Sequence, residues 1–181
     1  RLNNTINKNS IEFSPIYLND STLLYGSLRT DTALFVVHNN DGKAAEMPYR
    51  HFYVAKKDKN DWKFANEWLE GDFNKDAVHS GNGAFSPNKK HFYFTRCEQN
   101  WRYQIICKIY VSQNVNNQWS EPVELPEEIN MKKYSSTQPA VGTDSKTGCE
   151  VLYFVSNRPD GKGGMDIWYS IFQCKTQTWQ A

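Results

Sequence analysis

The sequence has no long apolar run and no excess of charge of one sign. No stretch of eighteen consecutive apolar residues occurs in its 181 residues, so we expect no transmembrane helix. The 21 basic and 20 acidic residues are interspersed and leave a formal net charge of +1. This balance lacks the single-sign patches that attract nucleic acid or anionic membranes. We therefore predict neither of these as a partner.

The sequence motifs of common catalytic and metal sites are also missing. There is no Gly-x-Ser-x-Gly elbow, and no Cys/His nucleophile pair is suggested by spacing. No His-x-x-x-His spacing occurs among the four histidines, and no two cysteines lie two to four residues apart, which argues against zinc. We predict no catalytic residue, no metal ligand and no cofactor, and we do not expect an enzyme. His79 is the one histidine that we place near a possible central channel.

Three similar hairpins are present instead, in a chain whose aromatic content of 14% favours sheet over helix. Their first strands cover residues 23–29, 91–96 and 152–158, and each ends on an arginine. Their second strands cover residues 51–55, 108–112 and 166–170. Each second strand is followed by a polar turn and a tryptophan, namely Trp62, Trp119 and Trp179. A strand–turn–strand unit that recurs in this way predicts an all-β repeat protein.

Further anchors flank the hairpins. Phe13-Ser14-Pro15, Phe85-Ser86-Pro87 and the looser Gln138-Pro139-Ala140 precede them. A leucine, three residues, an apolar residue and an asparagine follow them, at Leu69 to Asn74 and Leu125 to Asn130, and the same pattern opens the chain at Leu2 to Asn7. We divide the chain into the tail of a preceding unit (1–7) and three repeats (8–74, 75–130 and 131–181).

Four short strands per repeat are what a blade of a β-propeller needs. We therefore predict a propeller segment of about three four-stranded antiparallel blades. Three blades are too few for a typical closed ring, and the first residue is Arg1 rather than methionine. We expect the chain to be a mature or excised segment of a larger propeller.

The hairpins resemble the TolB-type (WD40-like) propeller repeat, whose pattern is Ser-Pro-Asp-Gly-Lys, then Leu-Tyr-Phe-x-Ser-Asn-Arg, then Gly-Gly-x-Asp-Ile-Trp. Residues 152–168 match it well, residues 85–96 match in part, and Lys108 stands where the aspartate belongs. The Gly-Lys-Gly-Gly-Met-Asp-Ile-Trp variant is similar to propellers of OmpA-family envelope proteins, and to PorE-like components of type IX secretion in particular. This resemblance covers nearly the whole chain.

The resemblance implies a periplasmic, outer-membrane-associated scaffold that binds envelope or secretion-system proteins. It implies contact with peptidoglycan only through a domain that this chain does not contain. One alternative is the propeller of a larger prolyl-oligopeptidase-type hydrolase. Another is a glycan-binding propeller, for which we expect exposed tryptophans clustered on one rim.

The pairing of the cysteines indicates whether the protein resides in an oxidising cellular compartment. In an antiparallel pair, residues that face each other have a constant index sum. If Phe94 faces Tyr110, Cys97 faces Cys107, and if Phe154 faces Trp168, Cys149 and Cys174 lie within one residue of register. We predict both as cross-strand disulfides, although four buried free thiols are the alternative. Two disulfides imply an oxidising compartment.

Two loops remain as candidate sites. In the turn of the third hairpin, Asn157, Asp160 and Asp166 offer oxygens for a ligand or cation. We favour a structural turn, in which Asp166 pairs with Arg158 or caps amides while Gly163 and Gly164 supply positive φ angles.

The insertion at residues 30–50 predicts an added strand (33–38), a tight turn (39–42) and a return (47–50). We expect either that it packs on its own blade or that it is a docking hairpin for a partner. In the second case the contacting residues are Phe35, Val37, Met47 and Tyr49.

Overall fold

The computed structural model describes residues 1–29, 34–38, 44–75 and 78–180. Within these ranges all regular structure is β, and every strand pairing in the sheets is antiparallel. The described part contains no helix of the length and apolarity that would span a membrane. The chain forms two compact units, residues 1–81 (unit 1) and residues 82–181 (unit 2).

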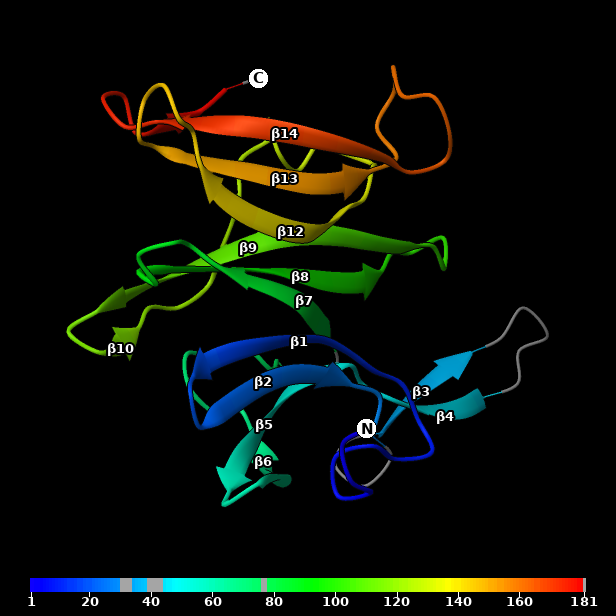
Figure 1. Cartoon of the computed structure of the whole chain (residues 1–181). Helices are drawn as coiled ribbons and strands as arrows, with labels where there is room; N and C mark the ends of the chain where they lie inside the picture. Colours follow the sequence, from blue (N-terminus) through cyan, green and yellow to red (C-terminus); the bar gives the residue numbers. More distant parts are fainter. Residues whose placement is uncertain (30–33, 39–43, 76–77, 181) are drawn as a thin grey trace. The chain divides into compact units, whose positions relative to one another are not determined.

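Unit 1 contains one four-stranded sheet and a separate hairpin (Figure 1). The sheet has the order β1 (Glu12–Asn19), β2 (Thr22–Ser27), β5 (His51–Asp58) and β6 (Asp61–Glu67). The hairpin consists of β3 (Leu34–His38) and β4 (Ala44–Pro48) and lies between β2 and β5 in the chain. Apolar side chains of β2, β5 and β6 and of residues 2–6 pack together in the core around Tyr25 and Tyr53.

Unit 2 contains two sheets. The first begins with β7 (His79–Phe85), a strand that spans the boundary between the two units. This sheet continues with β8 (His91–Gln99), β9 (Ile105–Val115) and the short β10 (Gln118–Trp119), while β11 (Val123–Glu124) also pairs with β9. The second sheet has the order β12 (Ser136–Thr143), β13 (Glu150–Ser156), β14 (Asp166–Gln173) and β15 (Thr178–Trp179). Strand β12 lies against β8 and β9 (Figure 1).

The two sheets of unit 2 share a core. Successive side chains of a strand point to opposite faces of its sheet, so one face of each sheet is turned towards the other. Tyr93 and Ile109 of the first sheet pack with Leu152 and Phe154 of the second, and Trp179 closes the cluster. The large aromatic and branched side chains therefore supply the apolar area that holds one sheet on the next.

The predicted hairpin registers are confirmed. Phe94 faces Tyr110, and Phe154 faces Trp168. The predicted disulfides Cys97–Cys107 and Cys149–Cys174 are both present, and no cysteine of the described residues is free. All three tryptophans after the hairpins lie in a strand that pairs with the second hairpin strand, namely Trp62 in β6, Trp119 in β10 and Trp179 in β15.

The Ser-Pro anchors do not occupy equivalent places. Ser14-Pro15 and Gln138-Pro139 lie inside β1 and β12, at register shifts where Ser14 and Gln138 have φ of 48° and 53°. In β7 the matching left-handed residue is Asn82, with φ of 49°. Ser86-Pro87 instead follows β7 in the turn before β8. The alignment of these anchors is therefore wrong, because a bulge and a turn share the same residue preferences.

The arginine of the second hairpin is also displaced. Arg96 lies within β8 opposite Lys108, whereas Ser156 of the third hairpin lies opposite Asp166. Arg158 therefore comes two residues later than Arg96 relative to its partner strand. Both guanidinium groups nevertheless lie over aromatic rings of their own hairpin, which explains why the two sequences align on arginine.

The asparagine after each hairpin binds main-chain atoms of the same sheet. Asn130 accepts a hydrogen bond from the amide of Ile109 (2.9 Å) and donates to the carbonyls of Ile109 (2.8 Å) and Leu125 (3.0 Å). Asn74 makes the same three bonds, to Phe52 and to the carbonyl of Trp68. Trp68 is buried and Leu69 is exposed, so the choice of Leu69 as an anchor is wrong by one residue.

Candidate protein-binding site

The tip of the β8–β9 hairpin, residues 100–104, is an exposed loop with several hydrogen bonds of its own. The carboxamide oxygen of Asn100 accepts hydrogen bonds from the amides of Arg102 (2.9 Å) and Gln104 (3.0 Å). The amide of Asn100 also donates to the carbonyl of Gln104 (2.9 Å), and Gln99 reaches the carbonyl of Tyr103. One asparagine side chain thus replaces part of the strand ladder and holds the loop in one conformation.

This tip exposes aromatic side chains on a cross-linked base. Trp101 is 81% exposed and Tyr103 66% exposed, and Ile105 is exposed beside them. The guanidinium of Arg102 lies 4.4 Å from the centroid of the Trp101 ring. Below the tip, the disulfide Cys97–Cys107 joins the two strands. Because the loop is already ordered, a partner that binds these side chains would lose little conformational entropy.

A hollow of about 310 Å³ lies on the same hairpin, next to the tip. Its lining combines three cations with two carboxylates, namely Arg96, Lys108 and Lys133 with Glu98 and Glu124. The pKa of Tyr110, which also lines the hollow, is raised by burial and by the nearby Glu124 carboxylate. This mixed-charge lining fits polar side chains of a protein partner better than an apolar ligand.

Lys108, which occupies the position of the repeat aspartate, has a structural role. Its Nζ donates to the carbonyls of Asn130 (3.1 Å), Met131 (2.7 Å) and Tyr134 (3.0 Å). Burial lowers the pKa of Lys108, and the carboxylates of Glu124 and Glu127 partly oppose this shift. The lysine therefore fastens the segment that leads into β12.

The turn of the third hairpin is structural in its contacts. Asp166 Oδ2 accepts hydrogen bonds from the amides of Lys162 (2.9 Å) and Gly163 (3.1 Å). Arg158 does not contact this carboxylate. It donates to the carbonyls of Glu128 (2.9 Å) and Ile129 (2.5 Å), and burial lowers its pKa.

The predicted role of the glycines in this turn is wrong. Neither Gly163 nor Gly164 has a positive φ, and the left-handed residue is Asp160, with φ of 71°. A Cβ on Gly161 would lie 2.2 Å from Asp166 Oδ2, whereas Gly163 and Gly164 have open space. Glycine is thus required at 161 for close approach of the Asp166 carboxylate.

The insertion forms the predicted added hairpin, but its return strand begins earlier than predicted, at Ala44. Phe35 pairs with Met47 and Val37 with Ala45, and β4 ends at Pro48. The predicted turn at residues 39–42 lies outside the described residues. Tyr49, at the base of the hairpin, has its ring 5.7 Å from that of His51 and 5.8 Å from that of His79. This aromatic contact anchors the insertion to the sheet of unit 1.

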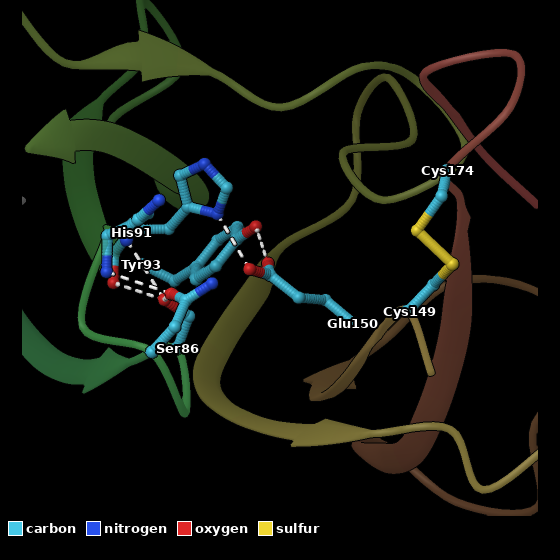
Figure 2. A network of polar contacts seen from close by, with 8 residues as sticks. Ser86, His91, Tyr93, Cys149, Glu150 and Cys174 are labelled. Carbon is cyan, nitrogen blue, oxygen red and sulfur yellow. Dashed lines mark hydrogen bonds and ion pairs between the residues drawn. A yellow bond between two sulfur atoms is a disulfide. The ribbon is translucent and has the colours of Figure 1, made fainter. Parts of the chain in front are cut away.

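A partly buried polar network joins the two sheets of unit 2 (Figure 2). The carboxylate of Glu150 lies 2.7 Å from Nδ1 of His91 and accepts a 2.5 Å hydrogen bond from the hydroxyl of Tyr93. The Ser86 hydroxyl contacts the main chain of His91 and the carboxamide of Asn88. This pattern orders side chains between sheets and places the network beside the Cys149–Cys174 disulfide.

The residues at the β8–β9 tip were missed by the sequence reasoning. Trp-Arg-Tyr in a short polar turn between two cysteines was the signal, because a large aromatic in such a turn has no core to enter. Of the six tryptophans, Trp101 alone is exposed in the described residues, so the clustered exposed tryptophans expected for glycan binding are not found there. The described residues also contain no group of three side chains suited to a metal ion.

A scan against protein-family models finds no match to the chain, and a search of curated proteins finds no similar sequence.

Proposed function

We propose that this chain is part of a β-propeller that serves as a non-enzymatic scaffold and binds other proteins. The observation that carries the proposal is the β8–β9 tip, where Trp101, Arg102 and Tyr103 are exposed on a disulfide-linked, internally hydrogen-bonded loop. Tryptophan, tyrosine and arginine are the residues that most often dominate the binding energy of protein interfaces.

The propeller part of the proposal is supported by the repeated four-stranded sheets and by the packing of β12 against β8 and β9. Neighbouring blades of a propeller stack in this face-to-face manner. The resemblance of the hairpins to TolB-type repeats of OmpA-family envelope proteins favours the same fold.

We place the protein in the periplasm, associated with the outer membrane, and propose envelope or type IX secretion proteins as partners. Two disulfides support an oxidising compartment. A contact with peptidoglycan would require a domain outside this chain. The β3–β4 hairpin is a second proposed docking element, through Phe35, Val37, Met47 and Tyr49.

A pull-down from envelope extracts tests the tip directly. The wild-type chain is compared with Trp101→Ala and Tyr103→Ala, and with Tyr17→Ala as a control, because Tyr17 is a similarly exposed aromatic in unit 1. We expect the control to retain a partner that both tip variants lose, since a binding hot spot costs about 2 kcal/mol or more when truncated. Equal recovery by all four proteins would contradict a role for the tip.

The same experiment examines the β3–β4 hairpin through deletion of residues 30–50. If the hairpin docks a partner, this variant loses a protein that the tip variants retain. Recovery of every partner by the deletion variant would rule out the docking role.

A further inference from the structure

One face of the β13–β14 pair exposes large apolar side chains. Tyr153 and Tyr169 are directly opposite each other in the register, with ring centroids 6.0 Å apart, and Ile167 lies two residues before Tyr169 on the same face. All three side chains are exposed, and Ile167 is 78% exposed. We call these three residues the Ile167 face.

The equivalent face of the β8–β9 pair is covered. Because Phe94 faces Tyr110 as Phe154 faces Trp168, Tyr93 corresponds to Tyr153 and Ile109 to Ile167. Ile109 is completely buried and Tyr93 nearly so. The same position of the repeat is therefore core in one sheet and surface in the next.

Two elements cover the β8–β9 face. The first is the segment of residues 125–130, in which Leu125 and Ile129 pack on Ile109, and Asn130 bonds to both the amide and the carbonyl of Ile109. The second is the following sheet, which adds Leu152 and Phe154 to the same cluster. Within the described residues, the outward-facing main chain of Ile167 has no corresponding asparagine.

The segment of residues 2–7 has the matching chemistry on its own surface. Leu2 and Ile6 pack on Leu23 and Tyr25, which correspond in register to Leu152 and Phe154. Asn7 donates to the carbonyl of Leu2 (2.7 Å), as Asn130 does to Leu125. Its Oδ1, unlike that of Asn130, accepts no hydrogen bond from the described residues.

A hollow of about 180 Å³ lies beside this segment and is lined by Leu2, Ile6 and Asn7 together with Leu23 and Tyr25. The corresponding space between the sheets of unit 2 is filled by Tyr93 and Ile109. The hollow is thus lined by residues that correspond to those in contact with Tyr93 and Ile109 in the covered interface.

We propose that the Ile167 face of one chain binds the 2–7 segment of a second copy of the chain. In this contact Asn7 of the second copy accepts a hydrogen bond from the Ile167 amide and donates one to the Ile167 carbonyl. Ile167 and Tyr153 enter the hollow beside Leu23 and Tyr25. The interface repeats, between two chains, the interface that residues 125–130 form between the sheets of unit 2.

Such an interface is head-to-tail, because it joins two different surfaces of the same chain. A variant defective in one surface keeps the other intact. Ile167→Asp places a charge in the apolar contact, and Asn7→Ala removes the carboxamide, so each alone prevents or weakens self-association. A mixture of the two variants retains one complete pair of surfaces and forms a dimer.

The experiment is sedimentation velocity over a wide range of protein concentration. We expect the wild-type chain to self-associate, and each variant to do so at least about tenfold more weakly, because a buried hydrogen-bond pair or an apolar contact is lost. The mixture of both variants restores a species of two chains. Val115→Asp, at an exposed valine at the end of β9, is the control and associates like the wild type.

Three results would overturn the proposal. These are a monomeric wild-type chain at every concentration, unchanged association of Ile167→Asp, and a mixture of the two variants that remains monomeric. Binding of a synthetic peptide of residues 1–8 by a wild-type chain that stays monomeric would assign the face to such a segment from another protein. That result also contradicts the second copy as the occupant. The thermal unfolding midpoint of each variant shows that it is folded.

Discussion

Glu150 of β13 and His91 of β8 are linked across the two sheets of unit 2, with Oε1 and Nδ1 2.7 Å apart. The other carboxylate oxygen of Glu150 accepts a hydrogen bond from the Tyr93 hydroxyl, so the Glu150 side chain binds two residues of the neighbouring sheet. Burial acts to raise the pKa of Glu150, but the hydrogen bonds from His91 and Tyr93 outweigh it, and the net pKa is lowered. The carboxylate form is therefore the one that stabilises the interface.

We predict that Glu150→Gln destabilises the chain by about 1.5–3 kcal/mol at neutral pH, as expected when a hydrogen-bonded charge is removed. Because the folded pKa is lowered, the contribution is present above the unfolded value and is lost as the pH falls through the folded pKa. Urea denaturation at pH 7 and near pH 3 measures the effect. The difference between wild type and variant should shrink at the lower pH, and an equal difference at both would contradict this account.

Lys108 offers a second test, because its ammonium binds three main-chain carbonyls. Replacing it with methionine keeps the chain length of the side chain and leaves those carbonyls without their donor. We expect Lys108→Met to destabilise the chain by about 1–3 kcal/mol in urea denaturation. Lys132→Met is the matched control, since Lys132 is exposed and lies 3.9 Å from Glu127, and it should change stability by less than about 1 kcal/mol. Equal effects of the two changes would refute the structural role of Lys108.

The two glycines of the third hairpin should respond differently to alanine. Gly161→Ala places a Cβ against the Asp166 carboxylate, which must then move away from the amides that it caps. We expect a loss of about 1 kcal/mol or more, the usual cost of a lost cap. Gly163→Ala meets open space and should change the unfolding free energy by less than about 0.5 kcal/mol. Thermal unfolding of both variants decides between this assignment and the one made from sequence.

The hairpins and their disulfides were predictable because residues that face each other in an antiparallel pair have a constant index sum. Once Phe94 faces Tyr110, the index sum determines that Cys97 faces Cys107, whatever the rest of the chain does. Residue type also identified the inner strands, since the continuous aromatic and β-branched runs of β5 and β8 are buried on both faces of their sheets. Local pattern was therefore sufficient for strands and register.

Position within a turn was much less predictable. Ser14-Pro15 and Ser86-Pro87 are the same dipeptide, yet one lies in a bulged strand and the other in a turn. Arg96 and Arg158 bind aromatic rings from positions two residues apart, because a guanidinium on a long side chain reaches the same ring from either. The exposed Trp101 was missed as well. Its position in a short polar turn was the available signal, because a large aromatic side chain there has no core to enter.

The last test concerns His79, which lies at the start of β7 and contacts the base of the β3–β4 hairpin. Burial, followed by the charges of Arg50 and His51, lowers the pKa of His79 from 6.5 to about 4. Its neutral Nδ1 accepts a hydrogen bond from the amide of Arg50 (3.2 Å), and protonation would abolish that acceptor. The unfolded chain therefore binds this proton more readily than the folded chain between these two pH values. Stability contributed by neutral His79 is fully present above about pH 6.5 and falls as the pH decreases towards 4.

We expect His79→Gln, which keeps a hydrogen-bond acceptor but does not titrate, to remove this part of the pH dependence. The shift corresponds to about 3 kcal/mol for a fully buried group, and partial exposure of His79 reduces the expected loss to about 1–2 kcal/mol. Urea denaturation of wild type and variant at pH 7, 5.5 and 4 measures the difference. If both proteins lose stability in parallel over this range, the His79 imidazole is not the titrating group.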